Sequence, residues 1–504
     1  MKNRFNYRPF LLAILTLILV GCSEDFLELE PRGTDLEDNF YQTEEEFFQG
    51  LVAVYDVLQW GGTHGWTMQL GLMNAISDDC YAGGSDASDQ PSWVAMDAFT
   101  IDPFLGPQRG FWEKGYYGIY RANIFLSRVA ATSVVTEEFK ARTVAEAKFL
   151  RAFYYFDLVR LFGNVPLITD VLGADDIYTQ VQASPAEVYA FIEQDLNDAL
   201  ATFELPATVP ASELGRITRG AVNALLGKVI LYQNDESRMA EAASLFEEVI
   251  SSGLYQLETN FEDIFKTNHE FGVESVFEIN FSDKHRGGWG NFGNQTEGNY
   301  NVQFFGMRDY VGPTYTGGYG FCPVTEELHE LMAFDPRLEH TIVDASQLRN
   351  QGADFTEGYQ NTDLFIRKYA PLAAERAADG EVALNWGNNI REIRYADVLL
   401  MAAEAHARAG NDGAARPYLF QVRQRVGLQP PGNLAGQDLL DAIYRERRLE
   451  LATEGHRYFD LVRTRRAATV LADEGFVAGK HELMPIPQAE IDITEGNLKQ
   501  NPGY

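Results

Sequence analysis

The densest group of side chains that could do acid–base chemistry lies at residues 445–463. Arginine, glutamate, aspartate and histidine alternate there with apolar residues at helical spacing, and Gly455 separates one expected helix from a second over 457–463. Arg447 and Glu450 stand three residues apart, which predicts an ion pair on one helix face. A catalytic cluster would use the same residue types. We favour a structural salt-bridge network that joins two packed helices, because such networks also shift pKa values.

Familiar catalytic and cofactor motifs are incomplete in this chain. Residues 288–293 match G-x-G-x-x-G, but no apolar helix follows whose N-terminus could hold a pyrophosphate. His481-Glu482 lacks the second histidine of a zinc protease helix, and no G-x-S-x-G occurs. The eight histidines are scattered. We therefore expect no catalytic residue, no cofactor and no metal.

Acidic residues gather in one stretch at Asp78, Asp79, Asp86 and Asp89. Carboxylates are preferred calcium ligands, but the spacing lacks the regular loop of a hand-type site. An acidic solvated loop is the simpler interpretation. A carboxylate pair for glycoside hydrolysis stays open as an alternative, because the separation that it needs is three-dimensional.

Aromatic rings beside short polar residues form the remaining group of candidates. They concentrate in two irregular stretches, 60–104 and 268–325. Loops of such length inside a compact protein are usually functional or disordered, and the aromatic content argues against disorder. Rings can cover the apolar faces of sugars while Asp, Asn, Gln and Arg bind the hydroxyl groups. The candidate ligand-binding residues are Trp66, Asp78, Asp79, Trp93, Trp289, Asn291, Phe292, Asn294, Tyr300 and Tyr315.

Each of these rings, taken alone, is more often a core or loop-packing residue than a ligand contact. Trp289 is the best placed of them, because flanking glycines in 287–293 offer little side-chain cover. Glycines also let a loop fold its tryptophan inward. Trp93 has apolar neighbours at Val94, Met96 and Phe99, which favours a packed ring.

The N-terminus has the form of an export signal. Three basic residues precede the apolar run 10–20, which is too short to span a bilayer. Leu19-Val-Gly-Cys22 then gives the small-residue-then-cysteine form of a lipoprotein signal. We expect a signal peptide over 1–21, lipidation of Cys22 and a tether over 22–42. A plain secretory signal is the alternative.

Charge and cysteine content limit the partners. The formal net charge is −32, and loss of Lys2, Arg4 and Arg8 with the signal would make it −35. Such a surface repels nucleic acid and anionic lipid. After Cys22 only Cys80 and Cys322 remain. They could form one disulfide in an exported protein, or be two buried thiols, which we favour.

Helical patterns dominate the rest of the chain. Capping boxes at 43–46 and 184–187 precede apolar stripes, and a third stripe runs over 145–159. One segment, 275–281, alternates like a strand. Two segments have the small–large spacing of tetratricopeptide helix pairs. Their key positions are Ala403, Gly410, Ala415, Leu419 and Val422 in one, and Gly227, Ala242, Phe246 and Val249 in the other.

Six blocks of the sequence, in order, resemble signatures of the SusD/RagB family of surface lipoproteins. The blocks are 145–166, 335–337, 394–405, 445–463, 483–487 and 500–504. One departure is Ala452-Thr453 before Glu454, where the family more often has a bulky apolar residue. We expect no functional consequence from it.

The resemblance implies a mainly α, SusD-like fold with tetratricopeptide-like helix pairs, a loop-rich ligand-binding region and few short strands. We expect an N-terminal helical part over 43–267 and a C-terminal part over 268–504, with ligand loops in 268–325. The family's ligand sites are built from the two irregular stretches named above.

The resemblance also implies a function. We expect a non-catalytic glycan-binding lipoprotein that acts as the lid of a SusC-like, TonB-dependent outer-membrane transporter in nutrient uptake. Ser23-Glu-Asp25 resembles a tag for the outward-facing surface, so the protein is expected in the outer membrane, facing the cell exterior. The open alternatives are a peptide ligand, as in RagB-type members, a surface glycoside hydrolase, and a tetratricopeptide adaptor.

Overall fold

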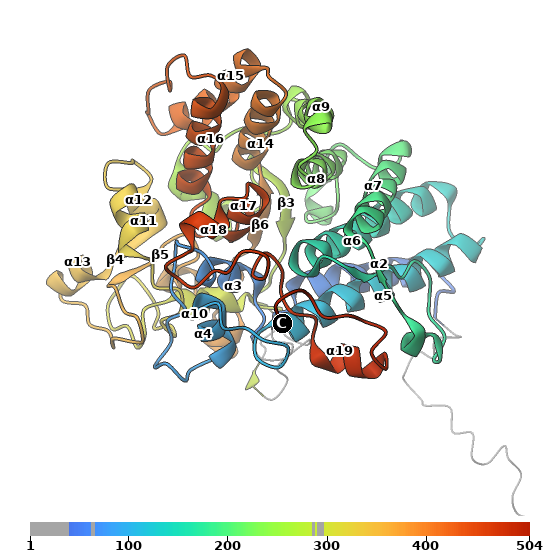
Figure 1. Ribbon diagram of the computed structural model, residues 1–504, viewed down its shortest axis with the longest axis horizontal. Helices are drawn as coiled ribbons and strands as arrows, with labels where there is room; N and C mark the ends of the chain where they lie inside the picture. The colour runs from blue at the N-terminus through green and yellow to red at the C-terminus, as the bar shows by residue number, and fades with distance from the viewer. Residues whose placement is uncertain (1–39, 62–65, 285–287, 290–296) are drawn as a thin grey trace, which may run out of the picture.

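Helices form most of the structure, a computed structural model that describes residues 40–61, 66–284, 288–289 and 297–504 (Figure 1). The mainly helical fold predicted from the sequence is confirmed. The longer helices are α2 Glu44–Asp56, α5 Gln108–Ala131, α6 Glu137–Phe162, α7 Pro185–Ala201, α8 Arg219–Tyr232, α9 Met239–Ser251, α14 Tyr395–Arg408, α15 Asp412–Arg425 and α16 Gly436–Leu451. The shorter helices are α3 Gln69–Ala75, α4 Pro91–Asp97, α10 Tyr300–Phe305, α11 Glu326–Leu331, α12 Leu338–Thr341, α13 Ala345–Asn350, α17 Arg457–Arg463, α18 Ala467–Val470 and α19 Gln488–Ile493.

Both predicted capping boxes are present. The Thr43 side chain accepts a hydrogen bond from Glu46 N at the start of α2, and Ser184 does the same for Glu187 at the start of α7. Each closes its first turn by satisfying backbone N–H groups that have no partner within the helix. The third predicted stripe lies in α6, which is buried along most of its second half.

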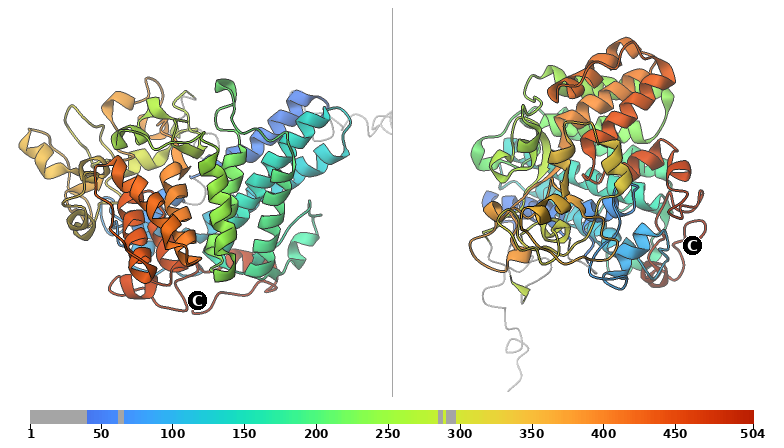
Figure 2. Two further views of the ribbon diagram at one scale, coloured as in Figure 1. Left: turned by 90° about the horizontal axis from the view of Figure 1, so that it is seen from above. Right: turned by 90° about the vertical axis from the view of Figure 1, so that its left-hand side faces the viewer.

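The long helices pack in one continuous series, α15, α14, α9, α8, α7, α6, α5 and α2 (Figures 1 and 2). The two predicted repeat pairs are α8 with α9 and α14 with α15. In the first pair, a Cβ added at Gly227 would lie 2.6 Å from the Phe246 ring. The small residue is therefore needed for the close crossing that the sequence predicts.

The strands are few and short, and each pairs with one antiparallel neighbour. They are β1 Val165–Pro166 with β2 Gln182–Ala183, β3 Ser275–Ile279 with β6 Ile390–Arg394, and β4 Ile342–Asp344 with β5 Leu364–Ile366. The predicted strand at 275–281 is β3. It joins the middle of the chain to the segment that enters α14, because Tyr395 N donates to Glu274 O at 2.8 Å.

One hydrophobic cluster runs from Phe47 to Leu498 and includes residues of both halves of the chain. A smaller cluster under β4 and β5 contains Tyr310 and Tyr315. Cys80 and Cys322 are both free and buried, so the favoured reading of two buried thiols is confirmed. Burial raises the pKa of both thiols well above the ordinary value, which makes them poor nucleophiles.

The charged stretch 445–463 is a buried salt-bridge network, as predicted. Arg394 Nη1 lies 2.7 Å from Glu274 and 2.5 Å from Glu450, while its Nε lies 2.8 Å from Glu454. Arg337 adds a second contact to Glu450 at 2.8 Å. These groups tie α16 to β6 and to the segment before α12.

Two details of that prediction were wrong. Arg447 does not pair with Glu450, because it turns to Asp397 on α14 at 2.6 Å and to Asp460 on α17 at 3.0 Å. Helix α16 also ends at Leu451, earlier than the expected stop at Gly455. Partners from other helices outcompete the local i,i+3 pair.

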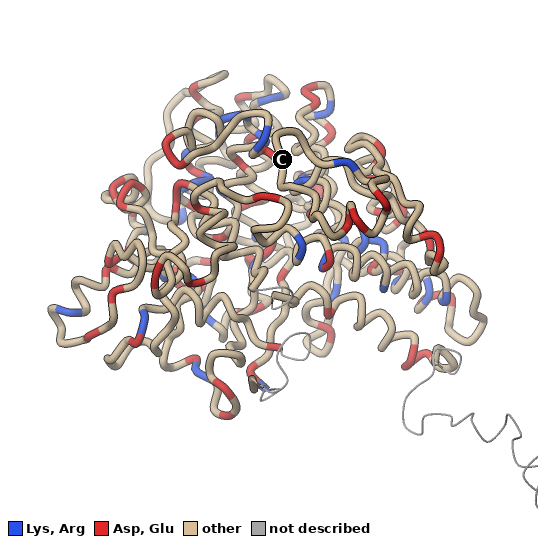
Figure 3. The backbone as a smooth tube through the Cα atoms, turned by 60° about the horizontal axis from the view of Figure 1, so that its bottom comes forward, with Lys and Arg blue, Asp and Glu red and all other residues tan. Residues whose placement is uncertain are grey.

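Acidic and basic residues are interspersed over the backbone in Figure 3. Several arginines, among them Arg337, Arg394 and Arg447, form buried ion pairs. Carboxylates are buried with them in these pairs, so the net charge of −32 reflects the excess of 73 acidic over 41 basic residues in the chain. Among the residues that the structure describes, no helix is both long and apolar enough to span a bilayer.

Candidate functional site

The two irregular stretches predicted to build a site lie against each other. Cys80 pairs with Val324 and Gly83 with Phe321 in isolated antiparallel bridges, and Gly84 N donates to Gly320 O at 2.9 Å. A Cβ at Gly83 would collide with the Gly320 carbonyl oxygen. Glycine is therefore required for this close approach, which joins the segment after α3 to the one after α10.

A continuous series of aromatic rings crosses this junction from the surface to the core. Trp289 is 50% exposed, and its ring stands edge-on to that of Trp66, with 6.2 Å between centroids. Trp66 in turn contacts Tyr300 at 5.6 Å and Phe304 at 5.0 Å. Phe304 stacks on Phe321 at 4.7 Å. Trp289 and Trp66 therefore present an aromatic surface that rests on packed rings.

The structure places Trp93 in the interior, which corrects its assignment to the ligand surface. The ring is 0% exposed, and its Nε1 donates to the Trp66 backbone oxygen at 3.1 Å. It packs on Phe304 and Phe321. Trp93 supports the loop that carries Trp66, so its contribution is positioning by packing.

Tyr300 and Tyr315 are also buried. Tyr300 lies beneath Trp66 at the start of α10, so it belongs to the support of the surface. Tyr315 belongs to the separate small cluster, where its ring contacts Tyr310 and its hydroxyl accepts from Arg367 at 3.2 Å. The structure does not bring Tyr315 into contact with the other predicted residues that it describes.

The assignment of Asp78 and Asp79 to the ligand surface is corrected in the same way, because both carboxylates are buried in ion pairs. Asp78 accepts from Arg457 Nε at 2.8 Å and Nη2 at 2.7 Å, and Arg448 Nε lies 2.9 Å from Asp79. Burial alone would raise the pKa of Asp78, but the two guanidinium groups hold it below its ordinary value. The pair ties the first loop stretch to α16 and α17.

Some predicted residues lie outside the described parts of the chain. These are the lipidation site Cys22 and the polar and aromatic candidates Asn291, Phe292 and Asn294. Their assignments stay predictions.

Tyr319 is a partly exposed ring that is not among the ligand-binding residues predicted from the sequence. It contacts Phe304 at 5.5 Å, which places it on the same aromatic support as Trp66. Burial raises the pKa of Tyr319. The Glu381 carboxylate raises it further and the Arg308 guanidinium lowers it, so both charged groups lie near the ring. Gly317, Gly318 and Gly320 surround it in sequence, the same signal that singled out Trp289.

A small cavity of about 70 Å³ lies below Tyr300 and holds unusual ionisable groups. Burial lowers the pKa of Lys114 to about 8 and that of His456 to about 4. Burial also raises the pKa of Glu392 to about 7, with a further rise from Asp157. Tyr300, whose ring supports Trp66, lines this cavity, so we treat these groups as structural.

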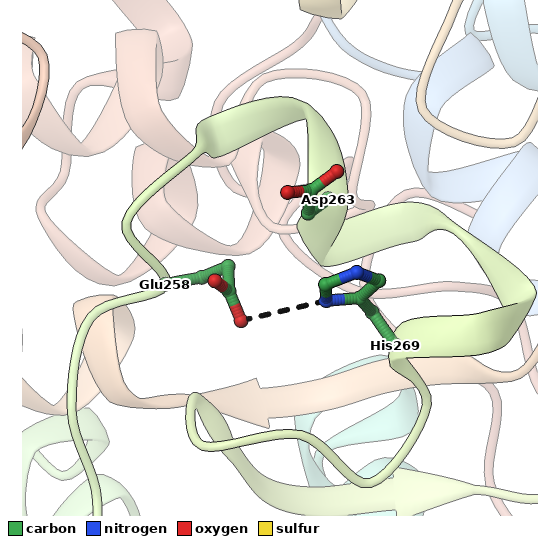
Figure 4. Close-up of side chains that lie close together, drawn as sticks. All are labelled: Glu258, Asp263 and His269. Atoms are coloured by element: carbon green, nitrogen blue, oxygen red, sulfur yellow. Dashed lines mark ion pairs between the residues drawn. The ribbon is translucent and has the colours of Figure 1, made fainter.

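Glu258, Asp263 and His269 form a group with metal-ligand chemistry in another part of the structure (Figure 4). Each offers one ligand atom within 4.8 Å of the others, and His269 Nδ1 lies 3.7 Å from Glu258. Asp263 is already neutralised by Lys266, whose ammonium lies 2.6 Å away. An ion-pair cluster at a partly exposed turn explains the group, and we assign no metal to it.

Comparison with known proteins gives consistent matches. Residues 273–504 match the family model described as SusD family, and residues 26–231 match the one described as starch-binding associating with outer membrane. A structure of a laminarin-binding SusD-like protein shares 40% identity, with a TM-score of 0.86, over 92% of this chain and 100% of that one.

Two further relatives are similar over most of their length. Surface glycan-binding protein A from Bacteroides thetaiotaomicron, solved with laminarihexaose, is 31% identical with a TM-score of 0.84, over 91% of this chain and 99% of that one. The starch-binding protein SusD of the same organism is 25% identical over 85% of this chain and 84% of its own length. The aromatic surface held between two paired loop stretches thus stands in a chain that belongs to the SusD family.

Proposed function

We propose that this protein is a non-catalytic glycan-binding lipoprotein that acts as the lid of a SusC-like, TonB-dependent transporter in the outer membrane. Glycan binding is supported mainly by the exposed Trp289 ring, which stands edge-on to Trp66. Tyr319 and Trp66 both pack on Phe304. The names of the laminarin-binding relatives support it.

The geometry suits sugars. Rings set edge to face, such as Trp289 and Trp66, present two differently oriented apolar surfaces to the C–H faces of a bent oligosaccharide. Arg308 and Glu381, both near Tyr319, offer donors and acceptors for hydroxyl groups. Trp66 is held at a φ of +62°, a backbone region unusual for its type, and such strain concentrates at binding sites.

The one acidic pair predicted for the site is not free to act as catalytic carboxylates. A glycosidase needs one carboxyl group as general acid and a second as base or nucleophile. Asp78 and Asp79, the acidic pair nearest in sequence to Trp66, are buried against Arg448 and Arg457. They are therefore not available to a substrate.

Laminarin is the first glycan to test, because it is the ligand named for the most similar of the relatives described above. The lipid-free protein, beginning after Cys22, is run in native gels that contain laminarin, starch or other polysaccharides, and the same mixtures are assayed for new reducing ends. We expect retardation by laminarin and no product.

Other results would redirect the assignment. Release of reducing ends would make the protein a hydrolase. If no polysaccharide retards the protein, titration with peptides follows, and peptide binding would favour a RagB-type ligand. Binding to neither class would contradict the proposed function.

The anchor and the partnership are tested in cells. A Cys22→Ala protein should lose acyl labelling and membrane association, and full retention in the membrane would place the anchor elsewhere. Native protein extracted in mild detergent should bring a large β-barrel protein with it. Recovery of the protein alone, with its transporter expressed, would contradict the lid role.

A further inference from the structure

A groove beside α5 is lined in part by exposed apolar residues. It lies between α5, the segment 166–180 and α19, and has a volume of about 390 Å³. Four large side chains on its walls are about half exposed: Tyr117, Tyr120, Ile177 and Ile493. Monomeric proteins rarely expose large contiguous apolar patches unless the patch binds something.

The polar groups in the groove are largely satisfied within the protein. The Asn123 amide donates to Ile168 O and Asp170 O, both at 3.1 Å, and Tyr116 donates to Pro166 O at 2.8 Å. Thr494 Oγ1 donates to Glu490 O at 2.8 Å. A sugar would find few partners here for its hydroxyl groups, which distinguishes this groove from the surface around Trp289.

The charges at the rim are acidic. Glu113, Asp170 and Glu490 line the groove. Arg109 pairs with Glu113 at 2.8 Å, so the other two carboxylates give the rim its net acidic charge. Anionic lipid headgroups would be repelled, because membrane surfaces are held by basic and aromatic residues together. The groove instead suits a polypeptide segment with an aromatic or aliphatic side chain next to a lysine or arginine.

The groove lies near the point where the described chain begins. Thr136 N, just after α5, donates to Glu44 Oε2 at the start of α2 at 3.5 Å. Along α5, Tyr120 is about 16 Å from the last residue, Ala131. Between Cys22 and Phe40 stand 17 residues, which can span at most about 60 Å. A lipid at Cys22 therefore keeps the groove within reach of a membrane-embedded partner.

We propose that this groove is the surface on which the transporter docks, through an exposed loop that carries an apolar side chain flanked by basic residues. The proposal rests on the partnership proposed above. It assigns separate surfaces to the two partners: the groove between α5 and α19 to the transporter, and the rings around Trp289 to the glycan.

The test compares acidic substitutions in the native host, and the single variants Ile177→Glu and Phe334→Glu add the same charge. Tyr120→Glu combined with Ile493→Glu places acids in the groove, and Ile177→Glu is an independent single variant on another wall. Phe334→Glu is the control, because its side chain is 100% exposed and does not line the groove. The measurements are the amount of transporter recovered in mild detergent, the glycan affinity and the melting temperature.

We expect both groove variants to recover at least tenfold less transporter than the wild type and the control, with glycan affinity unchanged. If the groove variants recover as much transporter as the wild type, the groove assignment is overturned, but the partnership is not. If the wild type recovers no transporter, the partnership and the groove assignment both fail, while retained glycan binding leaves the binding function standing. A wild-type dimer that the groove variants dissociate, with unchanged transporter recovery, would assign the groove to a second copy of this chain and contradict the proposal.

Discussion

Trp289 and Trp93 lie in opposite surroundings: Trp289 is half exposed at the surface, and Trp93 is fully buried. We predict that Trp289→Ala weakens glycan binding by about 2 kcal/mol, or about thirtyfold, because central rings in binding sites dominate affinity. Its melting temperature should barely change. Trp93→Ala should instead lose about 3–5 kcal/mol of unfolding free energy, because it leaves a cavity in the core.

Calorimetric titration with glycan and thermal melts of both variants separate the two roles. Unchanged binding together with a large loss of stability in Trp289→Ala would return this ring to the core.

Titration of Glu392 makes the free energy of unfolding depend on pH. Its pKa is raised to about 7, first by burial, whereas an unfolded glutamate titrates near about 4.3. Between these values the folded protein keeps a proton that the unfolded chain has lost, so this contribution to stability falls as pH rises from about 4.5 to about 7. Glu392→Gln removes the titration.

Denaturant unfolding at several pH values measures the difference between wild type and Glu392→Gln, in which the titrations of neighbouring groups such as His456 largely cancel. The wild type should lose about 1–3 kcal/mol relative to the variant between pH 4.5 and 7.5. A difference that is constant with pH, or of opposite sign, would contradict the assignment.

Sequence reasoning at the residue scale selected Trp66 and Trp289, which are partly exposed, but it also selected buried residues. Flanking glycines correctly indicated Trp289, and the same signal at Tyr319 was available and not used. Asp78 and Asp79 could not be recognised as ion-pair partners, because Arg448 and Arg457 lie about 370 residues away in the chain. Burial of Trp93 was indicated by its apolar neighbours, yet only the packed structure decides it.

At the scale of elements, the contact between the two loop stretches depends on Gly83. Its φ is +73°, and a Cβ there would collide with Gly320. Gly253 is a matched control, because its φ is +67° and nothing lies within 4 Å of its added Cβ. We predict that Gly83→Ala costs about 1–3 kcal/mol more than Gly253→Ala and also weakens glycan binding.

Chemical denaturation and glycan titration of the two alanine variants check this. Equal effects of the two substitutions would mean that left-handed strain alone matters and that the contact with Gly320 can relax.

The buried ion-pair network between β6 and α16 also holds elements together. Arg394→Gln would leave Glu274, Glu450 and Glu454 without one of their cations, so we expect a loss of about 3–5 kcal/mol. Arg109→Gln is the control, since its pair with Glu113 is half exposed and such pairs contribute about 0–1 kcal/mol. Urea unfolding compares them. A loss below 1 kcal/mol for Arg394→Gln would show that the network is dispensable.

Helix positions followed well from sequence, because capping boxes and apolar stripes are local signals. The boxes at Thr43 and Ser184 and the close crossing at Gly227 were all found in this way. The break after Leu451 and the partners of Arg447 were missed, because contacts with α14 and α17 decide them. The pairing of the two loop stretches came only from family resemblance.

At the scale of the whole molecule, a series of packed helices carries the paired loop stretches, and the loops carry the rings. The loops contain little regular structure of their own, so their shape depends on the helices and on the buried ion pairs beneath them. A rigid support of this kind lowers the entropy lost when a flexible sugar chain binds. The same body offers a second, apolar groove for a protein partner.

The central claim is that the exposed rings bind glycan without cleaving it. Calorimetric titration of laminarihexaose into the lipid-free wild-type protein, followed by chromatography of the same mixture, tests this most directly. The account predicts saturable binding that the Trp289→Ala protein loses about thirtyfold, with the hexasaccharide recovered intact. Binding that is unaffected by Trp289→Ala, or recovery of shorter oligosaccharides, would contradict it.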